Sequence, residues 1–493
     1  MKRLLKQQHA IEIKQGATQS GPESQPASLA PLTVRSTCGF LAVPPSPEVM
    51  AHLYAEYLRY RGKKKLSFGQ YLKKIGFTDP AVGLKGADSG AMPKPAPGQE
   101  LVMVPSRKVS GTLRIIVLLA DFADNKGTRP AGEYEDMLFS KGVFQTGSMR
   151  DFYAEASCGK VDVVGSVHGW FRMPHNYSYY VGSKSGMGNY PRNAQRLAED
   201  VLAAALKKKV PFKTDLDKFG NGAITGLFIV HAGQGAEAMT SIAAQAKAIW
   251  SHKAELQKPI KVTGTLSATN YLTVPEDCRV GVCAHELGHL AFGWDDFYDP
   301  NYDQDGSEWD GSGVWDLMAG GSWNGGGSTP AHPAGLHKSQ HQWVDVQEIA
   351  ATANGVVIPP YGNTSGTVVK IKSPQFTVTQ CLILENRRRK GFDKALPGEG
   401  LLVWRVDTKM EMVNPDRPAM LLVQADGRHS LEKPDDGDEG DAGDPFPGTA
   451  NKTEVGDMGG TSTSFPNAHS GVTLKNIIVD AGSGSVKLDV VIS

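Results

Sequence analysis

The amino-acid sequence predicts an α+β fold in which a mixed region of strands and helices, residues 111–345, precedes a β-rich region, residues 346–493. Two nearly continuous apolar runs, at 113–122 and 226–231, are typical of buried strands. Apolar residues at helical spacing in 193–208 predict an amphipathic helix. In the last part of the chain, short β-type runs alternate with turn residues, which is typical of a β-rich region.

The region before residue 111 has a different composition. Residues 1–37 are polar and lack periodicity, so we expect a disordered tail. Residues 38–110 are expected to form a helical region and a linker rich in proline and glycine. Ser46 is a suitable N-cap with Pro47 at the first helical position, and a second short helix is expected at 68–75.

Length and charge restrict the class of protein. A chain of 493 residues is too long for one core, so two or three domains are expected. Lys and Arg together number 52, as do Asp and Glu, so no net charge favours nucleic acid. No apolar run is long enough to span a membrane, and the basic N-terminus has no apolar stretch typical of a Sec-type signal peptide.

The five cysteines do not form the pattern of a disulfide-rich protein. Cys278 and Cys283 could pair in an oxidising compartment, and buried free thiols are the alternative. Cys38 precedes the α/β region and could bind a metal as a thiolate in a latent form; an ordinary unpaired cysteine is the alternative there.

A zinc-binding motif lies in the helix expected at 283–293. His285 and His289 are four residues apart, so both imidazoles lie on one helical face and can bind one ion. Glu286 lies beside them and can act as the general base for a water molecule that zinc activates. The alternative is that two histidines share a helical face by chance.

A catalytic zinc site needs a third protein ligand. Asp295, six residues after the second histidine and beyond the turn at Gly293, is the predicted ligand, and Asp296 and Asp299 are competitors. Met318, in a glycine-flanked turn, is expected to form a hydrophobic floor beneath the ion.

Two acidic loops are candidate calcium sites, because their oxygen ligands are closely spaced. A solvated acidic loop is the alternative for both. The candidate ligands are Asp299, Asn301, Asp303 and Asp305 in the first loop, and Asp438, Asp441 and Asp444 in the second.

The sequence leaves the rest of a catalytic site open. Residues 230–234 are expected on or after a sheet edge, where an extended peptide could bind by strand addition. No residue is assigned to stabilise the oxyanion. The weak candidates, each with a structural role as the alternative, are Trp323, His332, His337 and His341.

With these residues in hand, the chain resembles the immune inhibitor A family of secreted bacterial metalloproteases, within the metzincin-like zinc peptidases. The resemblance covers roughly residues 38–490. The matching segments are Val43-Pro-Pro-Ser-Pro47, Asp151-Phe-Tyr-Ala-Glu-Ala-Ser157, Val230-His-Ala-Gly-Gln-Gly235, Ile249-Trp-Ser-His252, the zinc motif with Asp296-Phe-Tyr-Asp299, Trp315-Asp-Leu-Met318, Glu385-Asn-Arg-Arg-Arg-Lys-Gly-Phe-Asp393, Pro397-Gly-Glu-Gly-Leu-Leu402 and Gly440-Asp-Ala-Gly-Asp-Pro-Phe-Pro-Gly448.

The resemblance implies a zincin-like catalytic domain with a mixed sheet and an active-site helix at 111–345. It also implies zinc on the two histidines of the motif, Glu286 as general base, a Met-turn at Met318, structural calcium, secretion, and an N-terminal pro-region that keeps the enzyme latent. One departure concerns the turn after the motif. The family pattern often has glycine three residues after the second histidine, whereas this chain has Phe292 there and Gly293 one residue later.

The sequence therefore predicts a zinc-dependent endopeptidase that acts on proteins or peptides. Two alternatives remain open: a catalytically silent binding or adhesion protein that keeps a metallopeptidase fold, and a zinc hydrolase that acts on a non-peptide amide. The oligomeric state is not predicted.

Overall fold

The first sheet of the molecule has six strands in the order β1-β5-β6-β4-β2-β3. The computed structural model describes residues 41–61, 66–77, 108–182, 184–299, 310–408, 418–433, 438–459, 461–465 and 468–493. The strands are β1 (Leu41–Ala42), β2 (Gly111–Asp121), β3 (Val161–Arg172), β4 (Gly226–His231), β5 (His252–Lys261) and β6 (Ser267–Pro275). β2, β3, β4 and β6 run parallel, whereas β5 is antiparallel to β6 and β1 is antiparallel to β5. The predicted mixed sheet is thus present.

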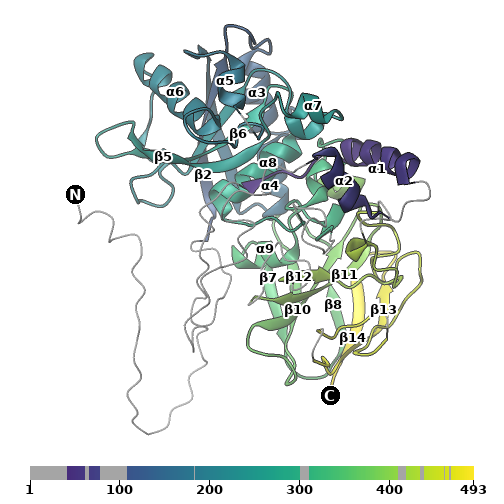
Figure 1. Ribbon diagram of the computed structural model, residues 1–493. Coiled ribbons are helices and arrows are strands. Elements are labelled where there is room, and N and C mark those ends of the chain that lie inside the picture. Colours follow the sequence, from purple (N-terminus) through teal and green to yellow (C-terminus); the bar gives the residue numbers. More distant parts are fainter. Residues whose placement is uncertain are drawn as a thin grey trace, which may run out of the picture. The chain divides into compact units, whose positions relative to one another are not determined.

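Helices cover both faces of this sheet because alternate side chains of its strands point to opposite sides. In β2, Ile115 and Val117 contribute to one apolar core, and Ile116 and Leu118 to the other. The first core includes residues of α3 (Ala131–Phe139), α4 (Met149–Ala156) and α8 (Val280–Leu287). The second includes residues of α5 (Tyr177–Val181) and α6 (Ala194–Lys207). Figure 1 labels these helices around the sheet.

Two N-terminal helices, α1 (Pro47–Arg61) and α2 (Phe68–Ile75), follow β1. α2 begins at a capping box, in which Ser67 accepts the Gln70 N–H and the Gln70 side chain accepts the Ser67 N–H. Buried residues of both helices, including Leu53 and Leu72, belong to the same apolar core as α4 and α8. The N-terminal helices therefore pack against the part of the fold that carries the zinc motif.

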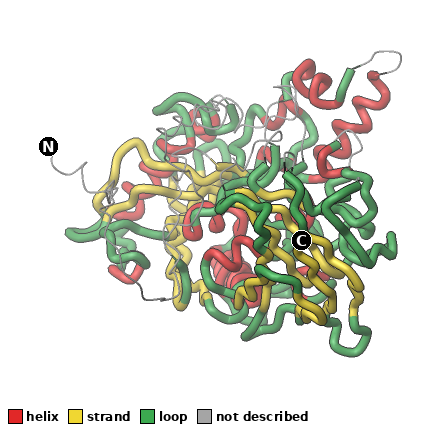
Figure 2. The backbone as a smooth tube through the Cα atoms, turned by 90° about the horizontal axis from the view of Figure 1, so that it is seen from below, coloured by secondary structure: helices red, strands yellow, loops and turns green. Residues whose placement is uncertain are grey.

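The C-terminal strands form a five-stranded sheet, β12-β11-β10-β9-β7, and a three-stranded sheet, β13-β14-β8. Figure 2 shows these strands in yellow near the C-terminus. Buried residues of both sheets share a third apolar core, which includes Leu382 and Leu488. The strands are β7 (Asp345–Ile349), β8 (Ala353–Ile358), β9 (Thr367–Ile371), β10 (Gln380–Arg387), β11 (Gly400–Asp407), β12 (Met420–Leu422), β13 (Val472–Val479) and β14 (Val486–Ile492).

Short helices complete the described part of the chain. They are α7 (Ile242–Gln245), α9 (Gly335–Gln340), the 3₁₀ turns η1 (Thr214–Leu216), η2 (Ala236–Ala238), η4 (Gly313–Trp315), η5 (Gly320–Trp323), η6 (Gly391–Ala395) and η7 (Ser430–Glu432), and a π-helical turn, η3 (Gly288–Phe292).

Residues 33–493 group as one unit by their backbone contacts. The predicted division at 38–110, 111–345 and 346–493 therefore stays a prediction. Among the described residues, no helix is both long and apolar enough to cross a membrane.

The expectation for residues 230–234 is wrong. β4 lies inside the sheet, between β6 and β2, because parallel strands pair with both of its sides. The edge beyond β6 is formed by β5, on which the two residues of β1 are paired.

Candidate metal centre

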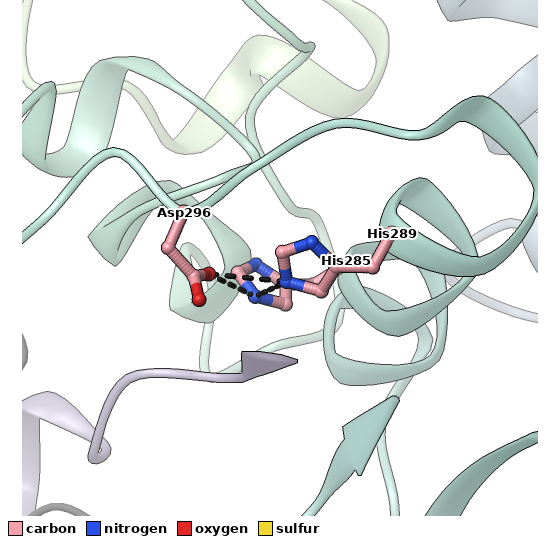
Figure 3. Close-up of side chains that lie close together, drawn as sticks. All are labelled: His285, His289 and Asp296. Atoms are coloured by element: carbon pink, nitrogen blue, oxygen red, sulfur yellow. Dashed lines mark hydrogen bonds and ion pairs between the residues drawn. The ribbon is translucent and has the colours of Figure 1, made fainter. Parts of the chain in front are cut away.

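The two histidines of the motif face one side of a helix that changes its winding between them. His285 lies in α8 and His289 in the π-helical turn that continues it. Their Nε2 atoms are 2.9 Å apart, and both side chains are buried. Figure 3 shows both imidazoles pointing toward the carboxylate of Asp296. The Oδ1 atom of Asp296 lies 3.1 Å from each Nε2.

The structure brings Asp296, and not the predicted Asp295, to the two histidines. A π-helical turn contains more residues than an α-helical turn, so the chain leaves the helix one residue later than an α-helix would allow. Gly293 then ends the turn with φ of 70°, a conformation that favours glycine. In the sequence, the glycine of this turn stands at 293, one residue later than in the family pattern. This shift was the available signal that the third acceptor also lies one residue later than Asp295.

The hydrogen bonds of the imidazoles determine which nitrogen atoms can bind a cation. His285 Nδ1 lies 2.9 Å from the Leu317 carbonyl oxygen, and His289 Nδ1 lies 2.7 Å from the Trp294 carbonyl oxygen. Because a carbonyl oxygen only accepts, each Nδ1 carries the proton of a neutral imidazole and each Nε2 presents a lone pair.

Three buried acceptor atoms thus converge, all within 4.8 Å of one another. Burial lowers the pKa of His289, which favours its neutral form. Burial opposes ionisation of Asp296, but the two imidazoles lower its pKa to about 2, so it is a carboxylate at neutral pH. None of these three atoms, two imidazole nitrogens and one carboxylate oxygen, carries a proton that could bond to another. Three such acceptors fit a divalent cation such as zinc.

Met318 lies directly beneath this helix. It is fully buried. A Cβ atom added at Gly288 would lie 2.8 Å from the Met318 sulfur and 2.9 Å from the Trp294 ring, so only glycine allows this approach. The Met318 carbonyl oxygen accepts the Phe297 N–H at 2.9 Å, which connects the methionine turn to the segment that carries the third acceptor.

Glu286 is fully buried beside the three acceptors. Burial raises the pKa of its carboxyl well above the usual value, and the charge of Asp296 adds to this. Its Oε1 accepts the Val43 N–H at 2.9 Å, and its Oε2 has no hydrogen-bond partner among the described residues. One carboxylate oxygen therefore contacts a peptide group of the N-terminal segment, and the other is left for a further donor.

With this geometry in view, the chain can be compared with known proteins. The model described as immune inhibitor A peptidase M6, catalytic domain, matches residues 128–350. Residues 128–350, somewhat less than half of the chain, thus resemble the catalytic domain of the immune inhibitor A peptidases. The matched M6 domain includes the three acceptors and Glu286, and it excludes β1, α1, α2 and most of the C-terminal strands.

Two kinds of curated relative support this resemblance. Over 323 residues the chain is 29% identical to the pre-pro-metalloprotease PrtV of Vibrio cholerae serotype O1, which covers 53% of this chain and 34% of that protein. Over 316 residues it is 30% identical to immune inhibitor A of Bacillus thuringiensis subsp. alesti, covering 54% and 45% respectively. The match thus spans about a third of PrtV and less than half of that immune inhibitor A.

The N-terminal segment Leu41–Ser46, outside the M6 match, lies across the candidate centre. Leu41 pairs with Lys253 of β5, and Ala42 with His252. The Ser46 N–H donates to the Glu237 carbonyl oxygen at 2.8 Å. In Figure 3, the purple ribbon of β1 passes beside the three side chains. The edge strand and the M6 centre are therefore already in contact with a segment of the same chain.

The first predicted calcium loop lies mostly outside the described residues. Asn301, Asp303 and Asp305 belong to the part of the chain that the structure does not describe. Asp299 is described and buried.

The carboxylates of the second predicted calcium loop do not converge within the described part of the chain. Asp441 contacts Arg428 at 2.9 Å, and Asp444 accepts the Trp315 indole N–H at 2.9 Å. The Asp438 side chain accepts the Gly440 N–H at 3.0 Å. The second calcium site therefore stays a prediction.

The remaining predicted residues are one tryptophan, three histidines and three cysteines. Trp323 lies at the centre, where its indole N–H donates to the Pro44 carbonyl oxygen at 2.8 Å. His332, His337 and His341 contact Glu155, Asp316 and the Val109 N–H respectively, so they serve the packing of the fold. Cys38 lies outside the described residues, and Cys278 and Cys283 are buried free thiols.

Proposed function

We propose that this chain is a zinc-dependent endopeptidase that hydrolyses peptide bonds of proteins, with His285, His289 and Asp296 as zinc ligands and Glu286 as general base. The observation that carries the proposal is the convergence of three proton-free acceptors beside a buried carboxylate that already contacts a peptide N–H. The match of residues 128–350 to a metallopeptidase catalytic domain supports it.

Zinc, when bound, supplies the positive charge that acidifies water and polarises a peptide carbonyl. Glu286 Oε2 takes one proton from the attacking water, whose oxygen forms a bond with the carbonyl carbon. The bond between carbon and nitrogen breaks, and the same carboxyl delivers the proton to the amide nitrogen. The contact between Oε1 and the Val43 nitrogen, 2.9 Å long, supports this reach. The products are a carboxylate and an amine.

We also propose that the segment Leu41–Ser46 keeps the chain latent. It occupies the edge of β5, where a substrate strand would pair, and its Val43 N–H engages the general base. Activity then requires that this segment leave the centre. Full-length chain is expected to be less active than chain nicked between the N-terminal helices and β2.

A catalytically silent binding protein is the second candidate. A protein of that kind has no need of Glu286, whose burial beside Asp296 is unfavourable for a charged group. The presence of this carboxylate therefore favours catalysis. A hydrolase acting on a non-peptide amide would use the same residues, and only its substrates would differ.

The decisive experiment measures casein cleavage by the zinc-loaded full chain after nicking with trypsin, which is then blocked by a serine-protease inhibitor. Glu286→Gln is expected to lower the rate by about 10²–10⁴-fold, because a general base is lost, while bound zinc is retained. Glu135→Gln, on the exposed face of α3, is the matched control and should cleave normally. Unchanged cleavage by Glu286→Gln, or cleavage that survives removal of the metal by a chelator, would refute the proposal.

A further inference from the structure

Three buried side chains, from separate parts of the chain, donate hydrogen bonds to three successive carbonyl groups of the segment Leu41–Ser46. Trp250 lies just before β5, Tyr298 lies two residues after Asp296, and Trp323 is the last residue of η5. All are at most 9% exposed. The pairs are Tyr298 Oη with the Ala42 oxygen at 2.6 Å, Trp250 Nε1 with the Val43 oxygen at 2.9 Å, and Trp323 Nε1 with the Pro44 oxygen at 2.8 Å.

The peptide group between Ala42 and Val43 is held at both of its polar atoms. Its N–H donates to Glu286, and its oxygen accepts from Tyr298. Peptide hydrolysis needs polar groups at these same two atoms. The nitrogen must receive a proton from the general base, and the oxygen gains negative charge in the transition state. This peptide group therefore marks where the bond to be cut would lie.

We infer that Tyr298 donates to the oxyanion formed from the carbonyl of the bond that is cut, while Trp250 and Trp323 hold the next two carbonyls of an extended polypeptide substrate. This inference rests on the proposed function. As the water oxygen bonds to the carbonyl carbon, the electrons of the double bond move onto the oxygen that the Tyr298 hydroxyl contacts. Tyr298 keeps its own proton throughout.

The burial of the donors indicates the substrate class. When the segment leaves, each of these buried hydroxyl or indole N–H groups loses its acceptor, which is unfavourable until another acceptor takes its place. Main-chain carbonyls of any extended polypeptide restore these hydrogen bonds without regard to its side chains, whereas a folded helix has its carbonyls engaged. The structure therefore indicates unfolded segments of protein as the substrate.

Side chains of the segment indicate what the site accepts on either side of the bond. Ala42 and Val43 are both fully buried, so a small residue before the bond and a β-branched apolar residue after it fit. Pro44 and Pro45 lack an N–H, and pairing with β5 is confined to Leu41 and Ala42. A substrate without these prolines could continue the strand pairing.

The test uses a quenched fluorescent peptide, Phe-Leu-Ala-Val-Ala-Ala-Ser, with the zinc-loaded, trypsin-nicked full chain. Cleavage is expected between the first Ala and Val. Tyr298→Phe is expected to lower kcat about 10²–10³-fold with little change in KM, because an oxyanion donor acts mainly in the transition state. Trp323→Phe keeps the aromatic ring and is expected to raise KM about fivefold, the effect of one neutral hydrogen bond, with kcat nearly unchanged.

Tyr180→Phe is the matched control, because this buried hydroxyl donates to Asp200 within the core on the other face of the sheet. It should leave kcat and KM near the wild-type values. A loss in Tyr298→Phe that lies wholly in KM, or a kcat within about threefold of wild type, overturns the assignment. An unchanged KM in Trp323→Phe overturns it too, and this variant decides if Tyr298→Phe does not fold. A wild type that cleaves casein but not this peptide overturns the inference alone, whereas one that cleaves neither refutes the proposed function and the inference with it.

Discussion

Two of the groups of buried polar side chains in the described part of the chain differ in the charges that they bring together. At the candidate metal centre, two neutral imidazoles and a carboxylate face one another. The second group, here called the Arg387 cluster, consists of Arg387, Asp393, Lys338, His332 and Glu385, all less than 5% exposed. Arg387 binds both carboxylate oxygens of Asp393, at 2.8 and 2.6 Å.

Both the candidate metal centre and the Arg387 cluster bury carboxyl and imidazole groups, so burial of such groups does not by itself indicate a metal site. In the Arg387 cluster, the guanidinium neutralises the carboxylates, and the Lys338 ammonium lies 3.0 Å from His332 Nδ1 and over the Tyr361 ring. At the metal centre, every inward-facing atom is an acceptor. No cationic side chain is among the three converging groups of the candidate metal centre, and this, not the residue types, distinguishes it from the Arg387 cluster.

The two groups are also connected. Arg387 Nη1 donates to the Trp315 carbonyl oxygen at 2.8 Å, in the turn that leads to Met318. Two residues later in that turn, Leu317 accepts from His285 Nδ1. A residue of the C-terminal sheet thus supports the turn that orients an imidazole of the candidate metal centre. We therefore expect that the M6 segment depends on the C-terminal strands for its stability.

The largest expected effect is on the Arg387 cluster. Arg387→Met leaves two buried carboxylates without their cation and should lower the free energy of unfolding by about 3–5 kcal/mol, measured by urea denaturation. The neighbouring Arg388→Met is the control, because Arg388 pairs with the partly exposed Glu399, and its loss should be below about 1 kcal/mol. Equal losses in both variants would remove the distinction between the two sites.

Zinc should stabilise the metal centre by a smaller amount. At a free zinc concentration of about 100 times Kd, the free energy of unfolding should rise by about 2.7 kcal/mol. Asp296→Ala should abolish most of this gain, whereas Asp295→Ala, one residue away, should retain it. The reverse result would return the third-ligand role to Asp295. If zinc does not stabilise the wild type, the candidate metal centre does not bind zinc, and it does not differ from the Arg387 cluster in this respect.

The smallest expected effect is at Lys338. At pH 7, Lys338→Met should change the free energy of unfolding by less than about 1 kcal/mol, because a buried cation and one hydrogen bond are lost together. Burial lowers the pKa of Lys338 to about 8, with the charge of Arg387 acting in the same direction.

The same variant should alter the pH dependence of stability. Between pH 8 and the usual pKa near 10.5, the unfolded wild-type chain binds more protons than the folded one. Wild-type stability should therefore rise relative to that of Lys338→Met across this interval, measured by urea denaturation at several pH values. A constant difference would mean that the burial of Lys338 has no effect on its protonation.

Much of the fold followed from local patterns. The expected strand at 226–231 and the helix at 68–75 have the expected ends, because an apolar run and a capping box are local signals. β3, β5 and β6 were not predicted. β5 alternates poorly, since only its first half is buried, and its pairing with β6 depends on residues remote in sequence. Edge and interior strands cannot be told apart without that pairing.

The sequence by itself placed His285, Glu286 and His289 close together, because they are neighbours within about one helical turn. Only the tertiary structure decided that Asp296 is the third acceptor, because the π-helical turn shifts the chain by one residue. Only the tertiary structure brings Val43 to Glu286, 243 positions away in the sequence. It also brings Tyr298, Trp250 and Trp323 to one segment, Leu41–Ser46. Contacts of this kind arise from packing among distant segments, which local spacing does not encode.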